Sequence, residues 1–274
     1  MVTLSESLLG RYAAVSLYNS PYRAHDEGRG VDLYPGDGSA PSPVSGEVIA
    51  TETVRAPFRP GVADQDHLVV IDTGERLARI LHVDPAVEAG DRLAVGDDLG
   101  ETVRTGYFDP WVDDHLHLGF RPPGADPVRA SGSLPVDLDA PIEPVAWDGT
   151  GEVHGREETY AVLDAPTHPA PGEAFAGVAA GGGALDGGLP HYERGGVLGG
   201  DPESDAPVAL AGTTVGTSDG RSVDWDAVEV SANGTPILGL SLALWRDRIA
   251  VTLVSRGDLP APGESVTVGI EPRG

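Results

Sequence analysis

Residues 113–120 read Asp-Asp-His-Leu-His-Leu-Gly-Phe, so histidine and leucine alternate within this short stretch. In a β-strand, successive side chains point to opposite faces, which places His115 and His117 on one face and the neighbouring leucines on the other. The leucine face can pack on a core, while the histidine face offers two imidazoles to a metal ion or a cavity. An edge strand with two solvated histidines is the simpler alternative, and the pair alone favours it.

The rest of the chain predicts many short strands and no long helix. Its 274 residues include 38 glycines and 24 prolines, and its apolar runs are short and separated by turn residues. Asn233-Gly234 lies between two such runs and is a strong hairpin signal. We therefore expect an all-β protein of two domains, a β-sandwich or barrel over residues 1–140 and an antiparallel β-sandwich-like domain over residues 141–274.

Two segments of the predicted second half lack a strand pattern. Residues 139–147 carry two prolines and are predicted to be a linker. Residues 179–200 are rich in glycine and are predicted to be a long ordered loop or a flexible excursion. No chemistry can be predicted for this half from its residues.

The chain is strongly acidic, with a net charge of −25 from 43 acidic and 18 basic residues. Such an excess repels itself unless counter-ions screen it. A hydrophobic content of 40% argues against a disordered acidic chain. The acidic residues are scattered, which favours a protein of a salt-accumulating (halophilic) cell over one that binds a cationic partner. Without a basic patch, we expect no nucleic-acid partner.

Cysteine is absent, so disulfides and cysteine-based metal sites are excluded. The first 18 residues lack the basic and apolar regions of a signal peptide, and no run of about twenty apolar residues could cross a membrane. We expect a cytoplasmic protein without a membrane partner, while export by another route stays open.

Five short elements of the first half are similar, in order, to the motifs of the lysostaphin-type zinc metallopeptidases. They are His25 with Gly30-Val31-Asp32, Ser42-Pro43-Val44-Ser45-Gly46, Ile80-Leu81-His82-Val83, residues 87–100 with Gly90-Asp91, and Thr105-Gly106 followed by His115-Leu116-His117. None of these elements is specific alone, but five in the right order indicate the fold. The resemblance spans about residues 20–135 and implies a duplicated hybrid motif domain.

The resemblance also implies a site. It assigns His25, Asp32 and His117 as ligands of one Zn²⁺, and His82 and His115 as catalytic residues beside the metal. Two neutral imidazoles and one carboxylate leave one position of a tetrahedral zinc ion open for water. Such a protein would use metal-bound water to cleave a bond of a peptide substrate or peptide-like partner.

The chain departs from the family pattern at the first ligand. The family places its histidine four residues before the aspartate, where this chain has Gly28, and His25 lies seven before Asp32. Seven extended residues would span about 23 Å, so the chain must double back for both side chains to reach one ion. Asp26 or Glu27 could take the vacant position instead, or the site could hold no metal.

Two functions therefore remain open. The first is a zinc-dependent endopeptidase, by family analogy one that cuts glycine-containing or wall-derived peptides. The second is a non-catalytic module of the same fold that acts in binding or assembly. The altered position of His25 and the missing export signal motivate this second function.

Overall fold

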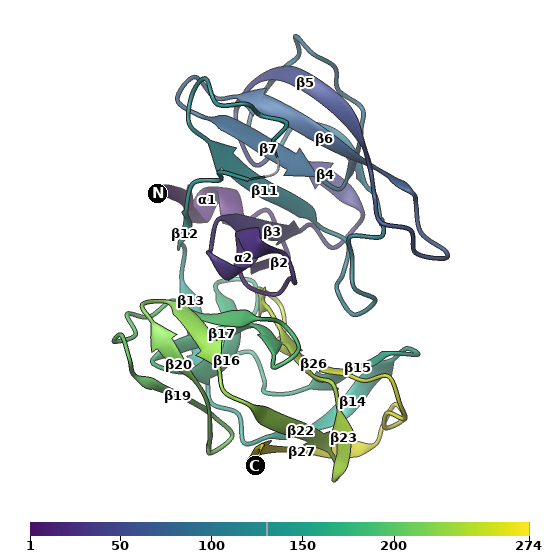
Figure 1. The fold of residues 1–274 in the computed structure, drawn as a ribbon, viewed down its shortest axis with the longest axis vertical. Helices are drawn as coiled ribbons and strands as arrows, with labels where there is room; N and C mark the ends of the chain where they lie inside the picture. The colour runs from purple at the N-terminus through teal and green to yellow at the C-terminus, as the bar shows by residue number, and fades with distance from the viewer. Residues whose placement is uncertain (130, 274) are drawn as a thin grey trace. The chain divides into compact units, whose positions relative to one another are not determined.

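The structure is a computed structural model that describes residues 1–129 and 131–273 (Figure 1). Strands make up most of its regular structure, and the helices of the described residues are the one-turn segments α1 (Glu6–Leu9) and α2 (Arg23–Asp26). The prediction of an all-β protein is confirmed. None of the helices in the described part of the chain is long and apolar enough to cross a membrane.

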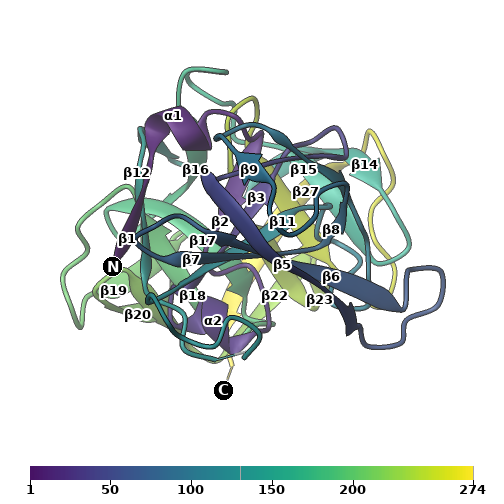
Figure 2. The same ribbon diagram turned by 90° about the horizontal axis from the view of Figure 1, so that it is seen from above.

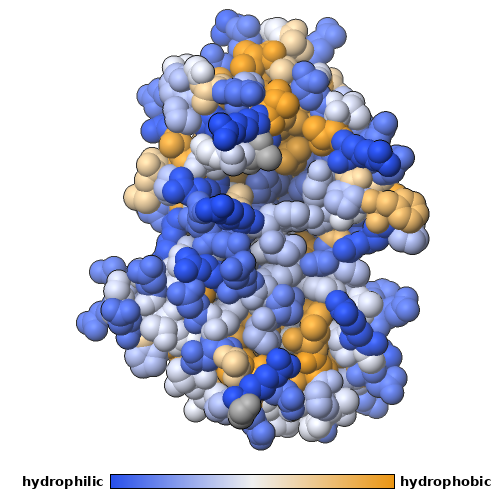
Figure 3. Space-filling view, viewed as in Figure 1, coloured by the Kyte–Doolittle hydropathy of each residue, from blue (hydrophilic) through white to orange (hydrophobic). Residues whose placement is uncertain are grey.

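The chain divides into two compact units. The first consists of residues 1–15 and 27–139, and the second consists of residues 16–26 together with the chain from Ala140 onward. The short segment 16–26, which carries His25, thus groups with the second unit although it precedes most of the first in sequence. Hydrophilic residues cover most of the face of the molecule drawn in Figure 3.

An antiparallel sheet forms the centre of the first unit, in the order β9-β5-β6-β7-β11-β3. Figures 1 and 2 show β5, β6 and β7 side by side. A smaller sheet has the order β4-β10-β8, and β1 pairs with β12 in parallel. The bounds of these strands are β1 (Val2–Ser5), β3 (Gly30–Tyr34), β4 (Ser39–Pro41), β5 (Gly46–Arg55), β6 (Gln65–Asp72), β7 (Leu77–Leu81), β8 (Val83–Pro85), β9 (Arg92–Leu93), β10 (Asp98–Thr102), β11 (Leu116–Arg121) and β12 (Val136–Asp139).

Strand β11 has the alternation that its sequence predicts. Leu116 and Leu118 are fully buried in the core of the first unit. The same strand pairs with β3 on one side and β7 on the other. Its two histidines therefore share a face of the sheet with side chains from both neighbouring strands. A sheet with one apolar and one polar face accounts for this alternation.

Gly46 opens β5 where the chain turns from the Pro43-Val44-Ser45 segment. A Cβ atom at this position would overlap the backbone carbonyl of Asp72 on β6. Only glycine therefore allows β5 and β6 to pair in this register.

The strand β2 (Ala14–Ser16) begins in the first unit, and the remaining strands belong to the second. Antiparallel pairing runs without a break in the order β14-β15-β26-β24-β17-β18-β21-β20-β19. Their bounds, with those of the other strands, are β13 (Ile142–Val145), β14 (Thr150–Arg156), β15 (Tyr160–Asp164), β16 (Phe175–Ala180), β17 (Gly183–Leu189), β18 (Arg194–Leu198), β19 (Pro207–Leu210), β20 (Thr213–Asp219), β21 (Ser222–Trp225), β22 (Val228–Ala232), β23 (Thr235–Ile237), β24 (Gly239–Leu242), β25 (Leu244–Trp245), β26 (Ala250–Val254) and β27 (Ser265–Pro272).

The hairpin predicted at Asn233-Gly234 is confirmed. Strands β22 and β23 pair up to Ala232 and Thr235, and both turn residues have positive φ, 49° at Asn233 and 78° at Gly234. Two positive φ values define the turn that best matches the twist of a two-stranded hairpin.

The linker predicted over residues 139–147 is wrong, because Ile142–Val145 form strand β13, paired in parallel with β16. Among the described strands, β13 pairs with β16 alone, and such an edge strand tolerates a proline, here Pro144.

The long loop predicted over residues 179–200 is also wrong, because this stretch contains the whole of β17 and β18. A Cβ atom at Gly195 would overlap the ring of Trp225, and one at Gly196 would overlap the ring of Tyr18. Gly195 and Gly196 therefore allow close packing of aromatic side chains on the sheet.

Candidate metal centre

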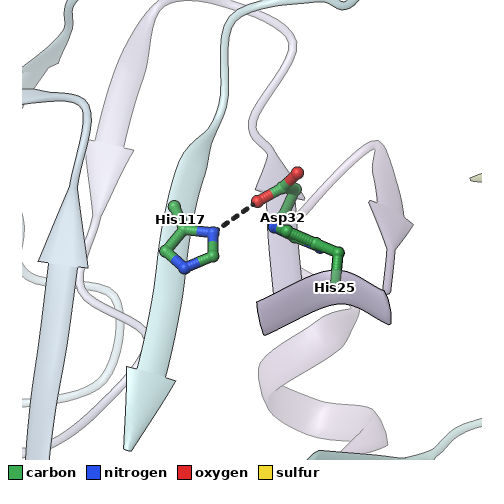
Figure 4. A group of neighbouring side chains, drawn as sticks. All are labelled: His25, Asp32 and His117. Atoms are coloured by element: carbon green, nitrogen blue, oxygen red, sulfur yellow. Dashed lines mark hydrogen bonds and ion pairs between the residues drawn. The ribbon is translucent and has the colours of Figure 1, made fainter. Parts of the chain in front are cut away.

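Asp32 and His117 face each other across two neighbouring strands. The register of β3 and β11 places them directly opposite, so their side chains share one face of the sheet. The Oδ1 atom of Asp32 lies 2.9 Å from Nδ1 of His117, as the dashed line in Figure 4 marks. Asp32 is 2% exposed, so this carboxylate is almost removed from water.

His25 lies on α2, and its ring is buried. Its Nδ1 atom is 2.8 Å from the carbonyl oxygen of Leu17. A carbonyl oxygen only accepts hydrogen bonds, so Nδ1 carries the proton and Nε2 keeps a lone pair. The one-turn helix, followed by Gly28 with a φ of 58°, doubles the chain back as the altered spacing requires.

One ligand atom from each of His25, Asp32 and His117 lies within 4.8 Å of the others (Figure 4). This group contains His25 and neither of the two acidic residues that could have replaced it. Of these, Glu27 forms an ion pair with Arg29, with 2.7 Å between Oε2 and Nε.

The Leu17 peptide that supports His25 is itself held by a buried carboxylate, Asp186 on β17. Its Oδ2 atom accepts the N–H groups of Leu17 at 2.6 Å and Tyr18 at 3.0 Å, and its Oδ1 atom accepts the hydroxyl of Ser16 at 2.6 Å. Burial raises the pKa of Asp186 to about 6, against the opposing effect of these three hydrogen bonds. Within the second unit, these contacts connect β17 to the segment that carries His25.

His115 is buried beside Asp32, with 3.4 Å between its Nε2 atom and Oδ2 of the carboxylate. Its Nδ1 atom donates to the carbonyl of Asp113 at 2.8 Å, so Nε2 carries no proton in the neutral ring. Burial lowers the pKa of His115 to about 4, although the charge of Asp32 opposes this shift. At neutral pH, a nitrogen lone pair therefore faces a carboxylate, an arrangement that a nearby cation would stabilise.

His82 follows β7 and is held by Asp66 on β6. The Nδ1 atom of His82 lies 2.5 Å from Oδ2 of Asp66, and the backbone N–H of His82 donates to Oδ1 at 2.9 Å. Burial alone would raise the pKa of Asp66. The hydrogen bond from the His82 ring, the electrostatic interaction with that ring, and the hydrogen bonds from two backbone N–H groups outweigh burial and lower the pKa. Asp66 is therefore ionised at neutral pH.

The rings of the site pack closely. The ring centroids of His82 and His115 are 5.3 Å apart, and those of His82 and His117 are 6.2 Å apart. Phe108 covers both catalytic candidates, with its centroid 4.7 Å from that of His82 and 4.5 Å from that of His115. This cover limits the access of water and strengthens electrostatic interactions within the site.

All five residues predicted from the sequence lie in or beside this cluster, as the preceding distances show. Sequence reasoning missed Asp66, Phe108 and Asp186. In a chain with 43 acidic residues, an isolated aspartate carries no local signal, and both aspartates act on segments distant in sequence.

The side chains of His25, Asp32 and His117 could hold a metal ion. Two imidazoles and one carboxylate are the ligands typical of catalytic zinc sites. Ligand atoms bonded to zinc at about 2.0–2.2 Å lie roughly 3.4 Å apart, so the three atoms need only small movements to bind one ion. The lone pair on Nε2 of His25, which the Leu17 carbonyl leaves unprotonated, is the group a metal requires.

The fold and this group of side chains define an all-β, two-domain protein with a candidate metal centre. Its sequence matches two models of one family, "Domain of unknown function (DUF8155) N-terminal domain" over residues 3–138 and the corresponding C-terminal domain over residues 143–271. Together these matches cover most of the chain, which belongs to this family. No curated protein gives a significant match to the chain.

Proposed function

We propose that the protein is a zinc-dependent hydrolase that cleaves a peptide bond, similar in its site to the lysostaphin-type metallopeptidases. The main support is the convergence of His25, Asp32 and His117, whose ligand atoms lie within 4.8 Å of one another. Two further buried histidines, His82 and His115, lie beside this group, and His82 is the side chain proposed to transfer the proton that hydrolysis needs.

In this proposal His25, Asp32 and His117 would hold a zinc ion, which would supply Lewis-acid activation of water and of a carbonyl group. The oxygen of water forms a bond to the carbonyl carbon, and one proton of that water passes to Nε2 of His82. The carbon–nitrogen bond then breaks as this proton passes to the leaving amine. The other proton of the water leaves with the new carboxyl group.

His115 has a different role in the same proposal. It is neutral at neutral pH because burial lowers its pKa to about 4. Its ring is held by the Asp113 carbonyl, and its unprotonated Nε2 atom, beside Asp32, is available to accept a hydrogen bond from the reacting group. A glycine-containing peptide is the first substrate to test, because the resemblance to the lysostaphin-type metallopeptidases implies this class of substrate.

Zinc content and peptide hydrolysis test this function. The purified protein, dialysed in high salt, should hold one zinc ion per chain, measured by elemental analysis. The His117→Ala variant should lose the ion, while His154→Ala, which removes an exposed histidine of β14, should retain it. Glycine-rich peptides should be cleaved by the wild type, and a chelator should abolish this cleavage.

Absence of zinc from the wild type, or equal zinc in wild type and His117→Ala, would contradict the proposed centre. Zinc binding without chelator-sensitive hydrolysis of any peptide would contradict catalysis and favour a non-catalytic binding module of the same fold.

A further inference from the structure

We propose that Asp66 is a positioning residue that fixes His82 in the tautomer with its proton on Nδ1. Nε2 is then the atom that accepts a proton during hydrolysis. This inference rests on the proposed function for its catalytic consequence, while the tautomer itself depends only on contacts within the first unit.

Asp66 is fully buried, and four donors converge on its two oxygen atoms. Oδ1 accepts the backbone N–H groups of His67 at 2.7 Å and His82 at 2.9 Å. Oδ2 accepts Nδ1–H of His82 at 2.5 Å and the hydroxyl of Thr105 at 3.2 Å. An ionised carboxylate can only accept, so the His82 ring must present a proton on Nδ1.

The backbone of His82 points to the same role. Its φ of 70° is uncommon for a residue other than glycine, and such conformations persist only where surrounding contacts impose them. Asp66 binds both the backbone and the ring of His82, and the carbonyl of His82 accepts the N–H of Val103 at 2.9 Å. Backbone and ring are therefore fixed together, which places one ring nitrogen reproducibly in the site.

An amide cannot replace this carboxylate without reversing the tautomer. In Asp66→Asn, the two backbone N–H groups at Oδ1 can bond only to the amide oxygen. The amide NH₂ group must then occupy the position of Oδ2 and face Nδ1 of His82. A donor at this position requires a lone pair on Nδ1, so the proton moves to Nε2. The Thr105 hydroxyl can rotate to accept from the amide, and the packing is otherwise conserved.

The tautomer can be measured directly by ¹⁵N NMR of the full-length protein with labelled histidine at pH 8, both metal-free and with zinc. The His82 signals are assigned with a His82→Gln variant. In the wild type, Nδ1 should show the chemical shift of a protonated ring nitrogen and Nε2 that of an unprotonated one. In Asp66→Asn this pattern should be reversed. In Asp84→Asn, which removes an exposed carboxylate near the same strand, it should be unchanged.

Activity gives a second readout. Asp66→Asn should keep its zinc content and its KM within about twofold, and should lose about 100-fold or more in kcat, the usual contribution of a general base. A wild-type His82 with its proton on Nε2, or on both nitrogens, would overturn the inference whether or not Asp66→Asn folds. An unchanged tautomer in folded Asp66→Asn would do the same.

These outcomes are distinguishable from failure of the proposed function. If the protein binds no zinc and cleaves no peptide, but the tautomer reverses in Asp66→Asn, the positioning of His82 by Asp66 stands and the hydrolase proposal falls. If zinc and hydrolysis are present but the tautomer does not reverse, the opposite conclusion follows.

Discussion

Asp186 offers the sharpest test of how the second unit supports His25, because two substitutions should change stability in opposite directions. Asp186→Ala removes the acceptor of two backbone N–H groups, those of Leu17 and Tyr18. Asp186→Asn is isosteric. Its amide oxygen can accept both N–H groups, and its NH₂ group can donate to the hydroxyl oxygen of Ser16.

The expected magnitudes follow from burial and hydrogen bonding. A buried donor left without an acceptor costs about 1–3 kcal/mol, so Asp186→Ala should lower the free energy of unfolding by about 2–6 kcal/mol. Burial raises the pKa of Asp186 from its ordinary value of 3.8 to about 6. The ionised carboxylate therefore destabilises the folded state by up to about 3 kcal/mol at pH 7, at 1.36 kcal/mol per pKa unit. Asp186→Asn should recover part of this amount.

The pH dependence has a defined sign. A carboxyl group whose pKa is raised in the folded state makes the wild type lose stability as pH rises from about 4 to about 6. Asn lacks this dependence. The advantage of Asp186→Asn over the wild type should therefore be near zero below pH 4 and reach its full value above pH 6.

Denaturant unfolding of the three proteins between pH 4 and pH 8 measures these differences, and calorimetric zinc titration measures the support of His25. The Leu17 carbonyl orients His25, and loss of such a partner typically weakens metal binding 10- to 100-fold, which we expect for Asp186→Ala only. If Asp186→Asn destabilises the protein as much as Asp186→Ala at every pH, the reasoning from burial is wrong. If zinc affinity is equal in all three, Asp186 does not position His25.

Two further predictions concern the other buried groups. Burial lowers the pKa of His115 to about 4, so the wild type should lose up to about 3 kcal/mol of stability as pH falls from 6.5 to 4, a loss absent from His115→Gln. Metal-free samples unfolded in denaturant at several pH values would show this, and parallel curves for the two proteins would contradict it. Gly195→Ala should lower the free energy of unfolding by about 1–3 kcal/mol, because its methyl group would overlap the ring of Trp225. The control is Gly220→Ala, at a turn glycine that has open space around it but a φ of 56°. Thermal scans of both variants distinguish the cost of overlap with Trp225 from the cost of backbone strain, because Gly220→Ala causes only the strain.

The sequence predicted the strands whose pattern is local. The alternation around His117 identified both faces of β11, and Asn233-Gly234 identified a hairpin, because each depends on neighbours in the chain. Strands of the second unit were missed where packing between distant segments decides the structure. Gly195 and Gly196 have the composition of a loop, yet they lie in β18 because Trp225 and Tyr18 occupy the space that side chains would fill.

In the candidate site, too, residues with a local signal were predicted and residues that act across long sequence distances were missed. Histidines are few, with 8 in 274 residues, so their order and spacing carried a signal. Asp66 lies sixteen residues from His82, and Asp186 lies 169 residues from Leu17. No periodicity links residues so far apart, and only the paired strands bring them together.

The division of the chain into two units has a consequence for expressing the protein as separate fragments. Residues 16–26 group with the second unit, and the acceptor of the Leu17 and Tyr18 N–H groups is Asp186. A fragment cut near residue 140 would contain these donors without their acceptor, and the complementary fragment would contain the acceptor without its donors. Each piece therefore lacks one side of this contact, and we expect residues 16–26 to unfold together with the chain from Ala140 onward.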